Sequence, residues 1–490
     1  MLTAIVFLPL VGAILIALVL RSDRSVRLAA GAVSLAELVL AIVVFALYKS
    51  DVGGIQLVDK IENWIPGLSG DTFAVQYFLG VDGLGLTMVI LTTLLFTVGV
   101  LISWKVELRS KEYFAWLLAL ETGVLGVFMA QDLILFFFFW EVELLPMYFL
   151  ISIWGSGRKE YSAMKFLLFT LGGSALMLVG FLALAFSADP ATFDMVALRD
   201  ADLSGAVLPL PAIFFLIFVG FAVKLPIFPL HTWLPDAHTD APTAVSVILA
   251  GVLLKMGGYG MIRILISIMP DTAQDYAVWL ASIAAISIIY GAIVTLRQTD
   301  LKRLIAYSSV SHMGFVLLGI AAMGQVGITG ATLQMFSHGV ITGLLFVVVG
   351  LIYDRTHTRD INELSGLAHV TPIIAVVMVM AGLASLGLPA TSGFVAEVTV
   401  LFGAAGRFPA PTILAVFGIL LTAGYILWMV MRVLFGPKNE RWAGLPDATA
   451  WWEQIPMAVL LAVILAVGIF PSRLVDIIDQ AIGPIASGLS

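Results

Sequence analysis

Long apolar runs recur along the whole of this sequence and leave few ways for it to fold. Each run is long enough to cross a bilayer as a helix, which takes about 20 residues. The runs cover residues 2–20, 26–48, 80–103, 113–130, 132–153, 163–187, 209–225, 244–268, 277–296, 303–323, 330–352, 371–406, 412–435 and 454–471. They predict an all-α integral membrane protein with fourteen transmembrane helices in one bundle, rather than several soluble domains.

Composition supports this interpretation and excludes several functions. Hydrophobic residues make up 61% of the chain and charged residues 12%, whereas about a quarter of a soluble protein is charged. The chain has no cysteine, which excludes disulfides, iron–sulfur ligation and thiolate metal sites. No basic tail or run of aromatic and basic residues suggests nucleic acid as a partner.

The basic residues predict the orientation in the membrane. Arg21, Arg24 and Arg27 follow the first apolar run instead of preceding it, the opposite of a cleavable signal peptide. With that run retained and the N-terminus outside, the inward loops hold seventeen of the 25 basic residues and the outward loops six. This excess on the inner side is typical of multi-pass proteins of the inner (cell) membrane. We therefore expect both termini on the outer, periplasmic side.

Two of the runs are interrupted by proline and glycine. The seventh ends in Lys224-Leu225-Pro226, and the twelfth contains Gly387-Leu388-Pro389. Because proline lacks a backbone donor and clashes with the preceding turn, both helices should be broken. The two runs are five spans apart, so they point in opposite directions, as in an inverted repeat whose broken helices form the transport site. The alternative is the general abundance of proline and glycine in membrane helices.

Ionisable residues inside these runs are candidates for function. A charge at the bilayer centre costs at least about 2.5–3.5 kcal/mol, so its presence there needs a reason. Lys224 lies at the seventh-helix break and Lys255 in the middle of the eighth span. If Glu141 of the fifth span pairs with Lys224, separating the two would switch the lysine between holding and releasing a proton. The alternative for Lys224 is a side chain that snorkels to the cytoplasmic face. For Glu141 and Glu143 the alternative is an interfacial position near a helix end.

Two further spans carry histidine within polar stripes. Ser308 and His312 are four residues apart on the tenth span, and Gln334, His338 and Thr342 repeat at the same interval on the eleventh. Residues four apart share a helix face, and histidine titrates near neutral pH. Such stripes could hold water and relay protons. The simpler alternative for each histidine is a structural role, in which its ring nitrogens form hydrogen bonds to a neighbouring helix.

Three other features complete the candidate set. Glu397 follows the twelfth-helix break, as a second acid in apolar surroundings or as a cap of the broken helix. Residues 231–240 include two histidines and two aspartates, for which loop or cap hydrogen bonds are favoured over a metal. Residues 80–85 are rich in glycine but open a membrane helix without the strand–helix context of a nucleotide site, so we predict no metal and no cofactor site.

Several motifs together resemble a known family, the antiporter-like membrane subunits of respiratory complex I. The resemblance extends from about residue 80 to 435 in the same order. The motifs are Val81-Asp82-Gly83, Phe139-Trp140-Glu141, Lys224-Leu225-Pro226, His231 to His238, Asp300 to Gly314, and Ser337-His338-Gly339. It implies fourteen core helices, with helices 4–8 (113–268) and 9–13 (277–435) as two inverted five-helix repeats, preceded by 1–112 and followed by 436–490.

The resemblance also implies roles for individual residues. Glu141 would be the fifth-helix glutamate that controls Lys224. Lys255 would link the input and output half-channels, and His312 and His338 would line the central hydrated axis. No family role follows for Glu143.

Glu397 would be the output group on the twelfth helix, where a glutamate resembles the M-type and a lysine the L- and N-type subunits. The L-type also has a long amphipathic helix beyond the fourteen spans. The resemblance implies proton translocation without redox chemistry in this chain, NADH, FMN, iron–sulfur clusters and quinone being bound by partner subunits. Its neighbours would be L- and N-type subunits and membrane lipids. Alternatives are a subunit of a multisubunit Na⁺/H⁺ antiporter or membrane-bound hydrogenase, and a passive scaffold.

Overall fold

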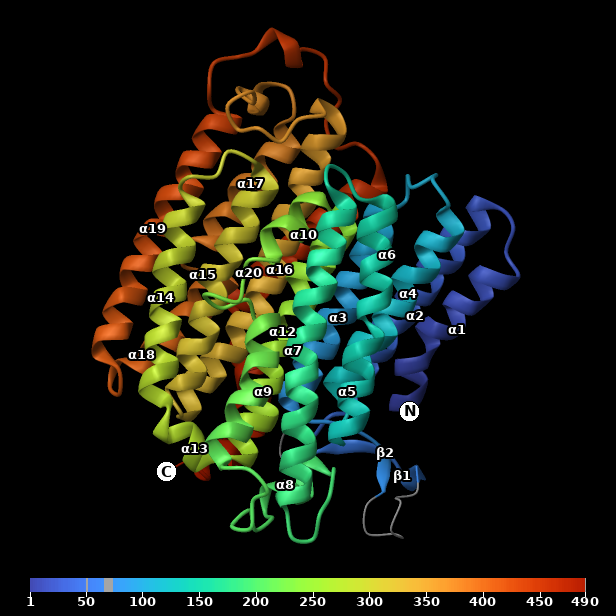
Figure 1. The fold of residues 1–490 in the computed structure, drawn as a ribbon. Helices are drawn as coiled ribbons and strands as arrows, with labels where there is room; N and C mark the ends of the chain where they lie inside the picture. The colour runs from blue at the N-terminus through green and yellow to red at the C-terminus, as the bar shows by residue number, and fades with distance from the viewer. Residues whose placement is uncertain (50–51, 66–73, 490) are drawn as a thin grey trace.

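The computed structural model describes residues 1–49, 52–65 and 74–489, and its long helices run side by side in a bundle (Figure 1). Within these residues, eleven helical segments are long and apolar enough to cross a membrane. They are α2 (Asp23–Leu47), α3 (Gly83–Ile102), α4 (Ser110–Met129), α5 with α6 (Leu133–Trp154), α7 (Lys159–Ser187), α11 to η3 (Thr243–Ile266), α14 (Ala277–Thr295), α15 (Leu301–Ala321), α16 (Gln325–Thr356), α19 (Pro409–Leu434) and α20 (Trp451–Ile469). The predicted class, a helical multi-pass membrane protein, is confirmed, apart from a β-hairpin.

Shorter helices complete the bundle. Four of them are apolar, namely α1 (Leu2–Leu18), α9 (Leu210–Lys224), α17 (Pro372–Ser385) and α18 (Ser392–Ala405). The others lie in connections or at the C-terminal end, namely α8 (Met195–Arg199), α10 (Leu234–Asp240), α13 (Pro270–Asp275) and α21 (Ser472–Ser487).

A β-hairpin that the sequence did not predict lies between α2 and α3. Its strands, β1 (Gln56–Ile65) and β2 (Val75–Val81), pair antiparallel with Lys60 opposite Phe78. The hairpin lies towards the same end of the bundle as both termini, the lower end in Figure 1. Asp59 in β1 accepts a 2.8 Å contact from the N-terminal ammonium. Burial alone would raise the pKa of Asp59, but this ammonium and hydrogen bonds from Thr3 lower it below the usual value.

The hairpin changes the expected context of the glycine-rich residues 80–85. A strand does precede the glycine-rich residues 80–85, although it belongs to an antiparallel pair and not to the parallel unit of a dinucleotide site. Asp82 caps α3 by accepting the Gly85 backbone N–H at 2.9 Å. The same carboxylate accepts from the Arg263 guanidinium at 2.5 Å. These residues therefore start a helix instead of cradling a phosphate.

Both predicted helix breaks are present. Helix α9 ends at Lys224, and the chain continues through a turn to α10. Helix α17 ends at Ser385 and α18 begins at Ser392. Between them Gly387 has φ +79°, a left-handed conformation that favours glycine. Proline and glycine thus interrupt these helices where the sequence indicated.

Two spans contain irregularities that the sequence did not reveal. The span Leu133–Trp154 divides at Glu143 into α5 (Leu133–Val142) and α6 (Leu144–Trp154). The span Thr243–Ile266 begins with α11 (Thr243–Ile248) and continues through the helices η2, α12 and η3. These are π-helical η2 (Leu249–Leu253), α-helical α12 (Leu254–Gly260) and π-helical η3 (Met261–Ile266). Segments of π-helix inside α-helices often mark functional sites, and Lys255 lies between these two.

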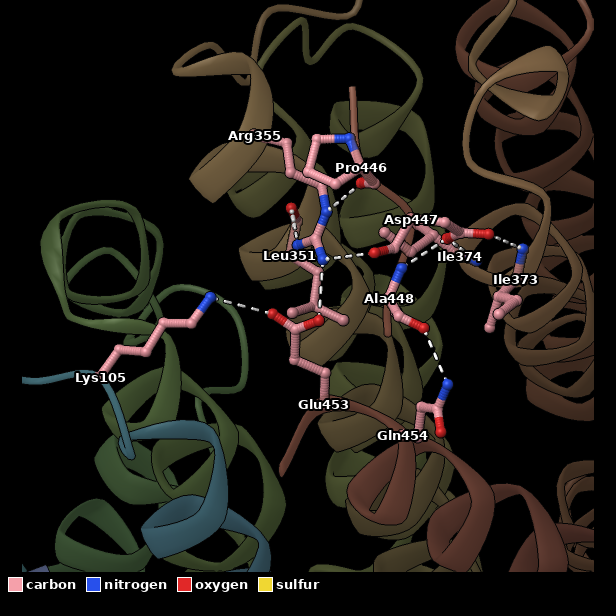
Figure 2. A network of polar contacts seen from close by, with 10 residues as sticks. All are labelled: Lys105, Leu351, Arg355, Ile373, Ile374, Pro446, Asp447, Ala448, Glu453 and Gln454. Carbon is pink, nitrogen blue, oxygen red and sulfur yellow. Dashed lines mark hydrogen bonds and ion pairs between the residues drawn. The ribbon is translucent and has the colours of Figure 1, made fainter. Parts of the chain in front are cut away.

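A polar network ties together helix ends away from the hairpin (Figure 2). Glu453 in the first turn of α20 accepts from Lys105 at 3.2 Å and from Arg355, near the end of α16, at 2.8 Å. Asp447 accepts the backbone N–H of Ile373 at 2.6 Å, which satisfies a free donor in the first turn of α17. The segment between α19 and α20 is fixed to the bundle by these contacts.

Candidate functional site

A buried ion pair lies at the break of α9. Lys224, the last residue of that helix, pairs through its ammonium with a carboxylate oxygen of Glu143. Their side chains are 1% and 0% exposed. The lysine nitrogen also lies 5.5 Å from the ring centre of Trp140 and 5.4 Å from that of Phe166. Because a buried charge is stable only with a partner, Glu143 supplies the counter-charge of Lys224.

The direct ion-pair partner of Lys224 is therefore Glu143 and not Glu141 as predicted, although Glu141 also lies within electrostatic reach of the lysine. Residues two apart on a helix point about 200° apart, so the two glutamates face different neighbours. Glu141 faces Ser174 of α7 and is only partly buried. Glu143 stands where α5 gives way to α6 and points at α9. Helix α4 packs directly against it, since a methyl group on Gly123 would lie 3.1 Å from the Glu143 nitrogen.

Lys255 on α12 begins a second cluster, which extends to α16, α15 and α18. Its ammonium donates to the Ala250 carbonyl of its own helix and contacts Nδ1 of His338 at 2.8 Å. In the π-helical turn the backbone N–H of Leu254 reaches Leu249, five residues back. The carbonyl of Ala250, which accepts the hydrogen bond from Lys255, thus lies within this π-helical turn. Lys255 is fully buried without a carboxylate contact among the described residues.

The cluster continues from α16 to α18. The rings of His338 and His312 lie 5.5 Å apart between centres. Nδ1 of His312 lies 3.3 Å from the Glu397 carboxylate, and its Nε2 lies 3.3 Å from the Ser385 hydroxyl. These side chains and Gln334 line a cavity of ≈ 10 Å³, room for about one water molecule. The structure therefore joins Lys255, His338, His312 and Glu397 in one cluster, and adds Ser385.

The two clusters adjoin at one close helix contact. A methyl group on Gly257 of α12 would lie 2.7 Å from the backbone nitrogen of Leu225, the residue after Lys224. The polar contacts of the described residues do not join Lys224 to Lys255 directly. Proton passage between them requires water or movement of the side chains.

The loop 231–240 holds helices together. Its Asp236 accepts from Lys165 at 2.7 Å, and Asp240 accepts from Ser162 at 2.6 Å. The ring of His238 stacks on Phe346 with centres 4.8 Å apart. These contacts agree with the hydrogen-bonding interpretation of the loop.

Comparison with known proteins identifies the family of this chain. Residues 130–433 match a family model described as NADH:quinone oxidoreductase/Mrp antiporter, transmembrane. The chain belongs to this family. Within it, the chain is 41% identical over 502 residues to NADH-quinone oxidoreductase subunit M of Rhodobacter capsulatus, and the alignment covers 98% of this chain and 95% of that protein.

Two solved structures share the fold. A chain of respiratory complex I from Thermus thermophilus with bound NADH superimposes with a TM-score of 0.89 at 28% identity, over 100% of both chains. A chain of the Mrp complex from Dietzia sp. DQ12-45-1b gives a TM-score of 0.86 at 23% identity, over 100% of this chain and 97% of that one. Both belong to multisubunit membrane complexes, so this fold occurs among other membrane subunits.

Proposed function

We propose that this chain is a proton-translocating membrane subunit of an NADH:quinone oxidoreductase. The observation that carries the proposal is the pair of buried ionisable clusters, each beside an interrupted helix and adjoining at α9 and α12. The relative most informative about the assembly is a subunit M of NADH-quinone oxidoreductase. Redox chemistry with NADH, FMN, iron–sulfur clusters and quinone belongs to partner subunits.

The clusters support a stepwise path for protons. Lys224 holds a proton while Glu143 is in contact, and releases it when that carboxylate is drawn away or neutralised. Lys255 receives the proton and passes it to His338 at 2.8 Å. His312 and then Glu397 continue the path, helped by the water-sized cavity between them. The direction of net movement is set by partner subunits whose state changes during quinone reduction.

The helices also support a finer topology. The eleven long apolar segments, α1, the broken α9 and the broken pair α17–α18 together make fourteen spans. In this arrangement residues 113–268 and 277–435 are inverted repeats, between 1–112 and 436–490. Both termini lie on the outer side of the inner membrane, and the neighbours are L- and N-type subunits.

The second candidate is a subunit of a multisubunit Na⁺/H⁺ antiporter or a membrane-bound hydrogenase. It is favoured by the fold shared with a chain of the Mrp complex. Purification of the native complex distinguishes the two, because only an oxidoreductase would bring NADH- and quinone-reactive subunits with this chain.

The proton-to-electron ratio tests the proposal. In vesicles containing the complex, Lys224→Ala should reduce proton pumping to a small fraction of the wild-type value per quinone reduced, because the ion pair at the α9 break is lost. Lys438→Ala, an exposed lysine in the segment after α19, is the matched control and should change nothing. An unchanged ratio in Lys224→Ala would contradict the proposal.

A further inference from the structure

Two further buried acids lie among the N-terminal helices, outside both clusters. Glu37 on α2 and Glu121 on α4 are each 0% exposed. All four of their carboxylate oxygens lack a hydrogen-bond partner among the described residues. Every other buried acid named above contacts a cation, a hydroxyl or a backbone donor. The state of these two groups therefore needs an explanation of its own.

The two acids lie at the same level of the bundle. Helix α1 packs between α2 and α4, since a methyl group on Gly12 would lie 2.8 Å from Val33 Cγ2 and 3.4 Å from Leu118 Cδ1. Glu37 follows Val33 by four residues and Glu121 follows Leu118 by three, one turn further on the same faces. Both helices run from the end opposite the hairpin towards it, so the two carboxyl groups lie at a similar level along the bundle. Glu37 lies within electrostatic reach of Glu121, and no hydrogen bond joins their oxygens.

No positive charge faces this pair. Helices α1 and α3, which pack against both, contain no ionisable side chain. The other charged groups of α2 and α4 are confined to their first two turns: Asp23, Arg24, Arg27, Lys111 and Glu112. The remaining elements that pack against α4 carry three charged groups, and each of these has another partner. Glu143 pairs with Lys224, and Glu141 lies near Ser174. Lys255 contacts His338. The nearby tyrosines, which are neutral at neutral pH, are Tyr77, Tyr113, Tyr148 and Tyr259.

An ionised carboxylate without a cation or a donor is strongly disfavoured in such surroundings. Two of them on adjacent helices are disfavoured further by their mutual repulsion. A proton removes both costs, because a protonated carboxyl is neutral. We propose that Glu37 and Glu121 form a proton-binding carboxyl pair that holds at least one proton at neutral pH. This proton site is separate from the clusters at Lys224 and Lys255. The proposal does not depend on whether this chain pumps protons.

Infrared difference spectroscopy on the purified complex tests this site. A protonated carboxyl group has a carbonyl stretching band, which shifts in heavy water and which ionised carboxylates lack. The spectrum of the wild type minus that of Glu37→Gln/Glu121→Gln at pH 7 should contain this band. The control, Glu107→Gln/Glu160→Gln, removes two exposed glutamates and should lose only carboxylate bands, because glutamate in water ionises near pH 4.3.

A difference spectrum for Glu37→Gln/Glu121→Gln that contains only carboxylate bands would overturn the proposal. Glutamine has the shape of a protonated glutamate, so the variant should pack normally. If it fails to assemble, Glu37→Met/Glu121→Met removes the same acids with an apolar replacement and the same comparison decides.

Discussion

The two ionisable clusters occupy similar places in the bundle but are built differently. Near the α9 break, Lys224 and Glu143 are opposite charges in direct contact, enclosed by aromatic rings. Near the α17–α18 break, His312 contacts Glu397 through a network that includes a serine, a glutamine and a water-sized cavity. A buried ion pair depends on a single partner, whereas the second cluster joins several side chains that can donate or accept hydrogen bonds. The first cluster suits control and the second suits conduction.

The largest effect should come from the control cluster. Glu143→Gln leaves Lys224 buried without a counter-charge, and removing one partner of a buried pair costs about 3–5 kcal/mol. The ion pair is then lost, and the proton-to-electron ratio should fall to a small fraction of the wild-type value. Glu141→Gln is the matched control two residues away and should lower the ratio less. A larger loss in Glu141→Gln would show that the carboxylates exchange roles during turnover.

A smaller effect is expected in the conducting cluster. Glu397→Gln removes the carboxylate beside His312 but leaves the serine, the glutamine and the cavity in place. Proton release should slow several-fold rather than stop, as measured by pumping rate in vesicles at fixed quinone reduction. Glu397→Asp should recover most of the rate, and the exposed Glu440→Gln should match the wild type. Complete loss of pumping in Glu397→Gln would make the two clusters equivalent.

The smallest effect on transport should come from the network at the end away from the hairpin (Figure 2). Glu453→Gln weakens contacts with Lys105 and Arg355, and a hydrogen bond to a charged group contributes about 1.5–3 kcal/mol. The complex should therefore inactivate at a lower temperature while its proton-to-electron ratio stays unchanged. A changed ratio would give this network a part in transport.

Much of the fold follows from local chemistry in the sequence. Long apolar runs identify the spans, and proline with glycine identifies the breaks after Lys224 and at Gly387, because the physical cause lies in the residue itself. The clustered residues Lys255, His312, His338 and Glu397 were found because ionisable groups are rare in apolar spans.

What the sequence did not reveal depends on contacts between distant segments. Glu141 and Glu143 look alike in sequence, and which one meets Lys224 is decided by the junction of α5 and α6 and by the packing of α4 at Gly123. The π-helical turns around Lys255 leave no pattern in residue type. The hairpin was missed because β1 is mostly exposed and rich in polar residues, whereas the apolar, buried β2 runs almost directly into the next span.

Lys255 offers the most direct test of the central claim, because the proposed path between the clusters passes through it. Lys255→Ala should leave quinone reduction measurable in the purified complex and lower the number of protons moved per electron in sealed vesicles. Lys438→Ala should give the wild-type ratio in the same preparation. A wild-type ratio in Lys255→Ala would contradict the account, since protons would then cross without the residue that joins the two halves.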